Sequence, residues 1–86
     1  MMKTIVFSGR ATAQLEALPE RAQQQVLDDL YRYAVTGSGD VKKLNGRDGY
    51  RLRSGSYRVI FAEDATTILA IYIGRRATTT YRRNQA

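Results

Sequence analysis

Residues 50–73, YRLRSGSYRVIFAEDATTILAIYI, decide the fold of this chain. They contain three runs rich in β-branched, aromatic and other apolar residues, at 50–53, 57–63 and about 67–73. The short polar segments SGS (54–56) and DAT (64–66) separate these runs and have the composition of turns. The stretch therefore predicts three consecutive strands joined as hairpins in an antiparallel sheet.

The first half of the chain predicts a strand and two helices. Residues 3–7, KTIVF, form a short β-branched run, and Ser8 can cap a helix that begins at residue 9 or 10. Pro19 ends this helix and suits the first turn of a second one, which the TGSGD segment at 36–40 stops. Helical spacing marks the apolar positions that we expect to face inward: Ala11, Leu15, Leu18, Ala22, Val26, Leu30 and Tyr33. The β-α-α-β-β-β order predicts a single α+β domain over residues 1–86, with two helices on one face of an antiparallel sheet.

Composition narrows the possible chemistry. The 86 residues contain no cysteine and no histidine, so the chain lacks disulfides, thiolate ligands and the usual general base. No apolar run reaches the length of a membrane span, and the N-terminal run is too short for a signal peptide. We therefore expect a cytoplasmic protein with no membrane association, no bound metal and no cofactor.

Positive charge is concentrated in the second half. The net charge is +6, but the first 40 residues carry four Lys/Arg against five Asp/Glu, and the remainder carries ten against three. Such asymmetry predicts a polyanionic partner, either nucleic acid or an acidic protein. The alternative interpretation is a basic surface that only confers solubility.

Alternation along the predicted strands places the arginines on one face. Side chains two residues apart share a face of a strand, so Arg51 and Arg53 lie together. We expect the helices to cover Leu52, Val59, Phe61, Leu69, Ile71 and Ile73. The opposite, open face would carry Arg51, Arg53, Arg58 and Tyr72, with Arg75 and Arg76 near its edge. The planar guanidinium fork binds phosphate oxygens in pairs, so this pattern predicts a phosphate-binding surface rather than a merely solvated one.

Three segments in combination resemble the RelE/ParE superfamily of bacterial type II toxin–antitoxin toxins. They are KKLNG (42–46), YRLRSGSYRVIF (50–61) and IGRR (73–76). The resemblance implies a toxin that a cognate acidic antitoxin neutralises. In the RelE-like branch the toxin cleaves mRNA in the ribosomal A site and inhibits translation, whereas in the ParE-like branch it poisons DNA gyrase without being an enzyme. We favour a metal-independent, ribosome-dependent endoribonuclease, an mRNA interferase; gyrase inhibition and an inactive member that only forms a repressor complex are the alternatives.

The resemblance also implies roles for individual residues. Arg58 matches the arginine that contacts the scissile phosphate, and Arg76 matches the arginine after the final strand. The implied catalytic set is Arg58, Arg76, Tyr81, Arg51 and Arg53, and the implied RNA-binding set is Lys42, Lys43, Arg75, Arg82 and Arg83.

The group that transfers protons stays open between two interpretations. Arginine remains protonated at physiological pH, so Arg51 and Arg53 cannot serve as general bases. Tyr81 lies near the position where the family resemblance implies a tyrosine that aligns the nucleophile or exchanges protons with it, so Tyr81 is the predicted proton-transfer or orienting group. The alternative is a surface tyrosine that packs on the last strand. Glu63 and Asp64 are weaker candidates, because they adjoin a turn.

Overall fold

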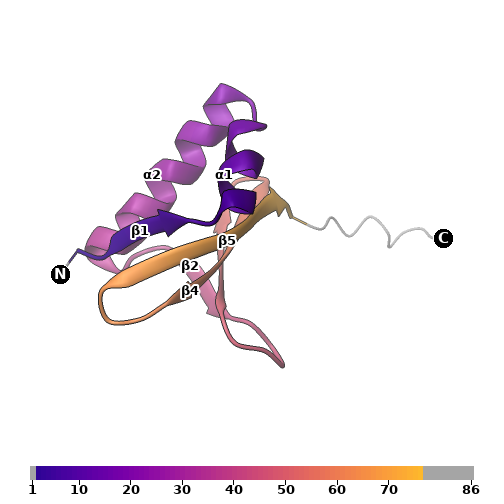
Figure 1. Cartoon of the computed structure of the whole chain (residues 1–86). Coiled ribbons are helices and arrows are strands. Elements are labelled where there is room, and N and C mark those ends of the chain that lie inside the picture. Colours follow the sequence, from indigo (N-terminus) through magenta and orange to yellow (C-terminus); the bar gives the residue numbers. More distant parts are fainter. Residues whose placement is uncertain (1, 77–86) are drawn as a thin grey trace.

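The computed structural model describes residues 2–76, which form two helices and five strands (Figure 1). Three site predictions, for Tyr81, Arg82 and Arg83, lie outside the described residues. In chain order the elements are β1 (Thr4–Phe7), α1 (Gly9–Glu16), α2 (Glu20–Thr36), β2 (Asp40–Lys43), β3 (Tyr50–Ser54), β4 (Tyr57–Glu63) and β5 (Thr67–Arg75).

The strands form one sheet in the order β1-β5-β4-β3-β2. The β3-β4-β5 meander is antiparallel, as the sequence predicts, and β2 continues it by pairing antiparallel with β3. Strand β2 was not predicted from the sequence, because it is short, polar and at the edge of the sheet. The predicted antiparallel sheet also needs correction, because β1 pairs with β5 in parallel and the sheet is mixed. Parallel pairing follows from the two helices, which carry the chain back across the sheet before the meander begins.

Both helices begin and end where local chemistry predicts. The Ser8 side chain accepts a hydrogen bond from the Ala11 backbone N–H at 3.0 Å and caps α1. Pro19 occupies the N-cap position of α2, and Gly37 ends that helix with φ of 77°, a left-handed conformation that glycine adopts without strain. No helix among residues 2–76 is long and apolar enough to cross a membrane.

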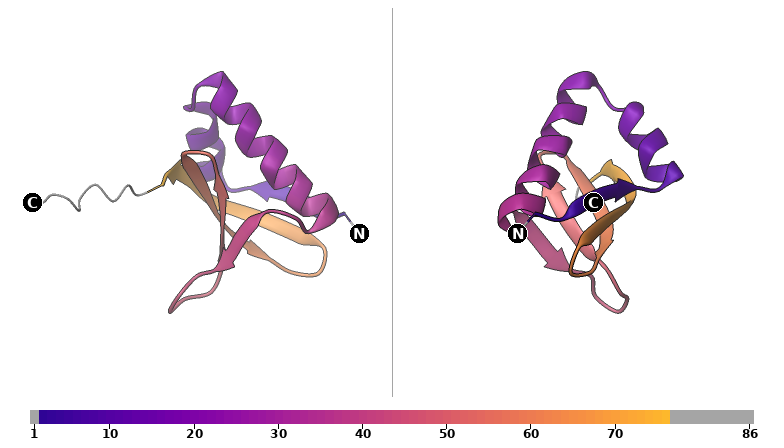
Figure 2. Two further views of the ribbon diagram at one scale, coloured as in Figure 1. Left: turned by 180° about the vertical axis from the view of Figure 1, so that it is seen from behind. Right: turned by 60° about the vertical axis from the view of Figure 1, so that its left-hand side comes forward.

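Both helices lie on the same side of the sheet (Figures 1 and 2), and the core lies between the helices and the sheet. The predicted inward residues of the helices are confirmed for Ala11, Val26 and Leu30, which are fully buried. From the sheet, the buried apolar residues are Leu52, Val59, Phe61, Ile68, Ala70 and Ile73. The opposite face of the sheet carries no helix, and the 44–49 loop projects from the molecule on the side away from the helices (Figure 2).

A β-bulge in β5 overturns part of the predicted inward set. Ile60 pairs with Tyr72 but Phe61 pairs with Ala70, so Ile71 is an extra residue on β5. The register shift turns Ile68 and Ala70 inward and leaves Leu69 and Ile71 38% and 39% exposed. The prediction that Leu69 and Ile71 lie under the helices is therefore wrong.

Side chains of α1 and of its N-cap residue hold the backbone of β5 at this bulge. The Ser8 hydroxyl donates to the Ile71 carbonyl at 3.2 Å, and the Ile73 N–H donates to the Gln14 side-chain oxygen at 2.8 Å. Strand β1 ends at Phe7 and cannot pair with this part of β5. Side chains from α1 thus replace the missing strand partner.

Candidate nucleic-acid interface

The open face of the sheet carries four cationic side chains, which we call the arginine face: Lys42, Arg51, Arg53 and Arg58. Their placement follows from strand register, since Lys42 is opposite Arg51 and Arg53 is opposite Arg58. Each alternates with a residue on the helix side, such as Leu52 or Val59, which is fully buried. The prediction that Arg51, Arg53 and Arg58 share the face opposite the helices is confirmed.

These cations outnumber the single carboxylate that the register places on the same face, Asp40 of β2, which lies opposite Arg53. Within residues 2–76 the ion pairs are Lys3 with Glu63 and Arg32 with Asp29, and neither involves the arginine face. The Nε atoms of Arg51 and Arg58 are buried and find no hydrogen-bond acceptor among the described residues. Like charges directly opposite across strands destabilise a sheet, so stability alone does not account for this arrangement.

The other described basic residues of the predicted site, Lys43, Arg75 and Arg76, do not lie on the arginine face. Lys43 is opposite Tyr50 and therefore on the helix side. Arg75 is opposite Tyr57, also on the helix side, and its guanidinium carbon lies 5.5 Å from the Tyr57 ring centroid. Arg76 donates to the Gly55 carbonyl at 3.0 Å, so in this structure its side chain is bound to the β3–β4 turn. The expected convergence of all the arginines on one face is thus wrong for Arg75, whereas Arg76 stays near the end of the β3–β4 hairpin.

A pocket of about 450 Å³ opens beside the arginine face, and we call it the Tyr72 pocket. Residues from α1, the 44–49 loop, β4 and β5 form it, and they include Arg10, Asn45, Arg47, Arg58, Ile60 and Tyr72. Three of these residues are cationic and none is acidic. Arg58 belongs to both the pocket and the arginine face, and so makes the two a continuous positive surface.

Sequence reasoning missed Arg10, Asn45 and Arg47 as pocket residues. Arg10 belongs to the near-neutral first half of the chain, and Arg47 lies between two turn sequences. No local pattern links either residue to β4 or β5, because only the packing of α1 and the 44–49 loop brings them there. The predicted position of Tyr72 on the open face is confirmed, because Tyr72 alternates with the buried Ile73 along β5.

The carboxylates next to the β4–β5 turn have structural partners. Glu63 pairs with Lys3 and accepts a hydrogen bond from the Tyr33 hydroxyl at 2.5 Å. Asp64 accepts from the backbone N–H groups of Thr66 and Thr67 at 2.9 and 2.8 Å, and these bonds lower the pKa of its carboxyl group. Glu63 therefore stabilises the fold on the helix side of the sheet, and Asp64 stabilises the β4–β5 turn. Within the described residues, no group of three or more His, Cys, Asp or Glu side chains is arranged to hold a metal ion.

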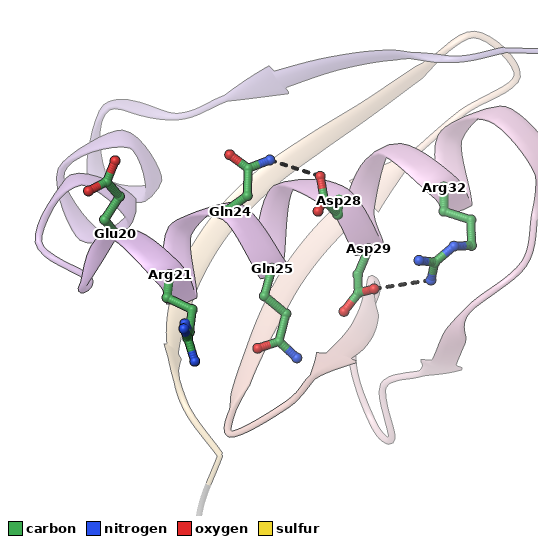
Figure 3. A pocket seen from close by; sticks show the side chains of 7 residues that line it. All are labelled: Glu20, Arg21, Gln24, Gln25, Asp28, Asp29 and Arg32. Carbon is green, nitrogen blue, oxygen red and sulfur yellow. Dashed lines mark hydrogen bonds and ion pairs between the residues drawn. The ribbon is translucent and has the colours of Figure 1, made fainter.

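A larger pocket of about 690 Å³ lies along α2 between Glu20 and Arg32 and differs in its electrostatics (Figure 3). Two pairs of its polar side chains are hydrogen-bonded to each other. Gln24 donates to Asp28 at 2.9 Å and Arg32 to Asp29 at 3.1 Å, as the dashed lines in Figure 3 mark. Because this pocket carries three carboxylates and two arginines, it lacks the predominantly positive charge of the arginine face.

Comparison with known proteins gives matches among solved structures. No protein-family model matches the chain, and no curated protein matches it. The isolated RelE toxin of E. coli superposes with a TM-score of 0.76 over 93% of this chain and 92% of that chain, at 19% sequence identity.

The chain has the RelE-toxin fold.

Two complexes extend the match. The toxin–antitoxin complex RelBE2 from Mycobacterium tuberculosis matches with a TM-score of 0.77 and 24% identity, covering 91% of this chain and 95% of that chain. The RelE–RelB complex from Pyrococcus horikoshii matches with a TM-score of 0.75 and 24% identity, covering 90% and 98%. The RelE-toxin fold of this chain therefore extends over nearly the full length of each match, at identities that establish architecture rather than activity.

Proposed function

We propose that this protein is the toxin of a toxin–antitoxin pair and that it cleaves mRNA on the ribosome. The observation that carries the proposal is the arginine face, a set of four cations on the open sheet surface of a RelE-toxin fold that form no ion pair among the described residues. Phosphate groups of RNA would supply the anionic partners that the described residues do not. The names of the matched RelE structures support the assignment to this class of toxin.

The chemistry that suits these residues is attack by a ribose 2′-hydroxyl on the adjacent phosphate. The hydroxyl loses its proton, a cyclic phosphate forms, and the 5′-oxygen of the next nucleotide leaves with a proton. Negative charge builds on the non-bridging phosphate oxygens during this step. Arg58 is best placed to hold them, because it lies on the central strand β4 and at the pocket; one such donor contributes about 3 kcal/mol to transition-state stabilisation.

Arg51, Arg53 and Lys42 would hold the flanking phosphates. Arginine stays protonated at neutral pH, so these side chains contribute charge and alignment rather than proton transfer. Tyr81 remains the predicted proton-transfer group, and it lies outside the described residues. Alignment of the 2′-hydroxyl with the leaving oxygen would come in part from the ribosome, which explains why a toxin without histidine can still promote the reaction.

An acidic antitoxin is the proposed protein partner. Several of the matched structures are RelE–RelB complexes, and a basic surface such as the arginine face attracts an acidic chain by the same electrostatics that attract RNA. Covering this face would exclude the mRNA. Because the proposed substrate is translated mRNA, the proposed location of the protein is the cytoplasm.

Primer extension on a defined mRNA in a purified translation system tests the proposed activity. The samples are the wild type, Arg58→Ala and the matched control Arg21→Ala, each with and without ribosomes. Arg21 is an exposed arginine of α2, in the pocket that Figure 3 shows, on the other side of the sheet. We expect ribosome-dependent cuts from the wild type and Arg21→Ala, and at least a hundredfold slower cutting by Arg58→Ala.

Two results would contradict the proposal. The first is an absence of cuts from folded wild-type protein in the presence of ribosomes; inhibition of gyrase supercoiling by the same sample would then favour the ParE-like alternative. The second is equal cutting by Arg58→Ala and Arg21→Ala, which would remove the arginine face from the mechanism. Circular dichroism of each variant establishes that it is folded.

A further inference from the structure

Tyr72 lies on the floor of its pocket in an orientation that Gly74 makes possible. Gly74 is opposite Arg58 in the sheet, and a Cβ atom on Gly74 would collide with the Tyr72 hydroxyl and the adjoining ring atoms. The ring therefore extends along β5 over Gly74, towards the strand position of Arg58. Next to it, Ile60 and the bulged Ile71 add apolar surface to the pocket. The pocket thus combines an aromatic and apolar surface with a cationic rim formed by Arg10, Arg47 and Arg58.

Arg10 covers Tyr72 from the first turn of α1. Its guanidinium carbon lies 5.2 Å from the Tyr72 ring centroid, within the range of a cation–π contact. The first turn of a helix is electrostatically unfavourable for a cation, and the first turn of α1 contains no acidic residue that would compensate. Arg10 is nevertheless exposed to solvent, so one side of its guanidinium group remains available for contact.

We propose that Tyr72 and Arg10 form a seat for one unpaired nucleobase of the RNA, beside the phosphate held by Arg58. This inference rests on the proposed function and gives it a base-binding subsite. Nucleobases stack on aromatic rings and on guanidinium planes, and single-stranded RNA is recognised mainly in this way. The pocket volume of about 450 Å³ is in the range of small-molecule sites, and its cationic rim suits the phosphates on either side of the base. A role that is only structural, with Arg10 pinning α1 to β5, would require no base.

Binding of short oligonucleotides to the free protein distinguishes these two roles. The probe is a fluorescently labelled, fully 2′-O-methylated RNA hexamer, which cannot be cleaved because its 2′-hydroxyls are blocked. Its partner is an abasic hexamer with the same number of phosphates. Fluorescence anisotropy at low salt gives both affinities for the wild type, Tyr72→Phe, Tyr72→Leu and the matched control Tyr31→Leu. Tyr31 is a tyrosine of α2 that is 54% exposed and lies outside the Tyr72 pocket.

We expect the wild type to bind the base-containing hexamer at least tenfold more tightly than the abasic one. Tyr72→Phe retains this ratio, because its ring still supports the guanidinium plane of Arg10 on which the base stacks. Tyr72→Leu brings the ratio close to one and leaves the affinity for the abasic hexamer unchanged. Tyr31→Leu behaves as the wild type does, and urea unfolding establishes that each variant is folded.

Several outcomes would contradict the proposed base-binding site at Tyr72 and Arg10. Equal affinities of the wild type for the two hexamers would reduce the pocket to a phosphate site. An equal loss of both affinities in Tyr72→Leu would assign Tyr72 a structural role. A lack of binding to either hexamer would overturn the seat together with RNA binding itself. Base-dependent binding without cleavage on ribosomes would support the seat and contradict only the proposed mRNA cleavage.

Discussion

Arg53 and Arg58 are direct neighbours across the β3–β4 hairpin, and both are partly buried. Opposed like charges cost a sheet a few tenths to about 1 kcal/mol. The neighbouring pair, Lys42 and Arg51, repeats the arrangement one strand pair further along the sheet. This arrangement therefore lowers the free energy of unfolding somewhat, and it concentrates positive charge where the proposed RNA phosphates bind.

Removing the charge of Arg58, whose cross-strand neighbours are Arg53 and Gly74, should stabilise the fold while it weakens RNA binding. We expect Arg58→Gln, which keeps much of the side-chain length, to raise the free energy of unfolding by about 0.5 kcal/mol at low salt. Urea denaturation measures this gain, which should shrink in high salt because ions screen the repulsion. Arg21→Gln on α2 is the matched control and should change little. A gain that is absent at low salt, or independent of salt, would show that Arg53 and Arg58 do not repel each other significantly.

Gly74 and Tyr72 should be energetically coupled. Gly74→Ala should lower the free energy of unfolding by about 1–3 kcal/mol, because the added methyl group collides with the Tyr72 ring. In a Tyr72→Leu background the same change should cost much less, since leucine lacks the colliding ring atoms. A double-mutant cycle by urea denaturation gives the coupling. Gly9→Ala is the control, as nothing lies within 4 Å of the added atom there, and strictly additive effects of the Gly74 and Tyr72 changes would refute the contact.

Tyr33 should make the stability depend on alkaline pH. Burial, together with the hydrogen bond to the Glu63 carboxylate, raises the pKa of Tyr33 from 10.0 to about 12. A phenol whose pKa is raised in the folded state favours folding below pH 10, and this contribution is lost as the pH rises from 10 to 12. The tyrosinate absorbance of the wild type minus that of Tyr33→Phe should therefore titrate near pH 12. Titration of this difference near pH 10 would mean that neither the burial of Tyr33 nor its bond to Glu63 persists in solution.

Ser54 should be important for stability because it joins β3 to α2. Its side chain is 1% exposed, and its hydroxyl donates to the Asp29 carboxylate at 2.6 Å. Ser54→Ala leaves that carboxylate with one donor fewer, and we expect a loss of about 1–3 kcal/mol in thermal or urea unfolding. Ser56→Ala, in the exposed turn after β3, is the matched control and should cost under about 0.5 kcal/mol. Equal losses for the two variants would show that the Ser54–Asp29 bond does not stabilise the fold.

The features that could be read from the sequence are those that depend on a few consecutive residues. Ser8, Pro19 and Gly37 mark the helix ends through capping and backbone preference, and the structure has each of them in that role. The alternation along β3 and β4 depends only on strand geometry, so the positions of Arg51, Arg53 and Arg58 on the open face were predictable. The motifs around these arginines likewise indicated the RelE-like architecture.

Tertiary structure decided the features that local sequence patterns do not determine, such as strand register and edge strands. The bulge at Ile71 arises where β5 meets β4 and α1, so the inward turn of Ile68 and Ala70 could not be read from alternation. Strand β2 has only Val41 as an apolar residue, and it becomes a strand because β3 offers it backbone partners.

The candidate site divides in the same way. Its arginine face is determined by the sequence, because alternating side chains of adjacent strands must share a face. The Tyr72 pocket exists only in the folded chain, because Arg10 and Tyr72 are 62 positions apart and meet through the packing of α1 against β5. The sequence by itself thus determined the elements and the charge of the surface, while long-range packing decided which residues surround the pocket beside it.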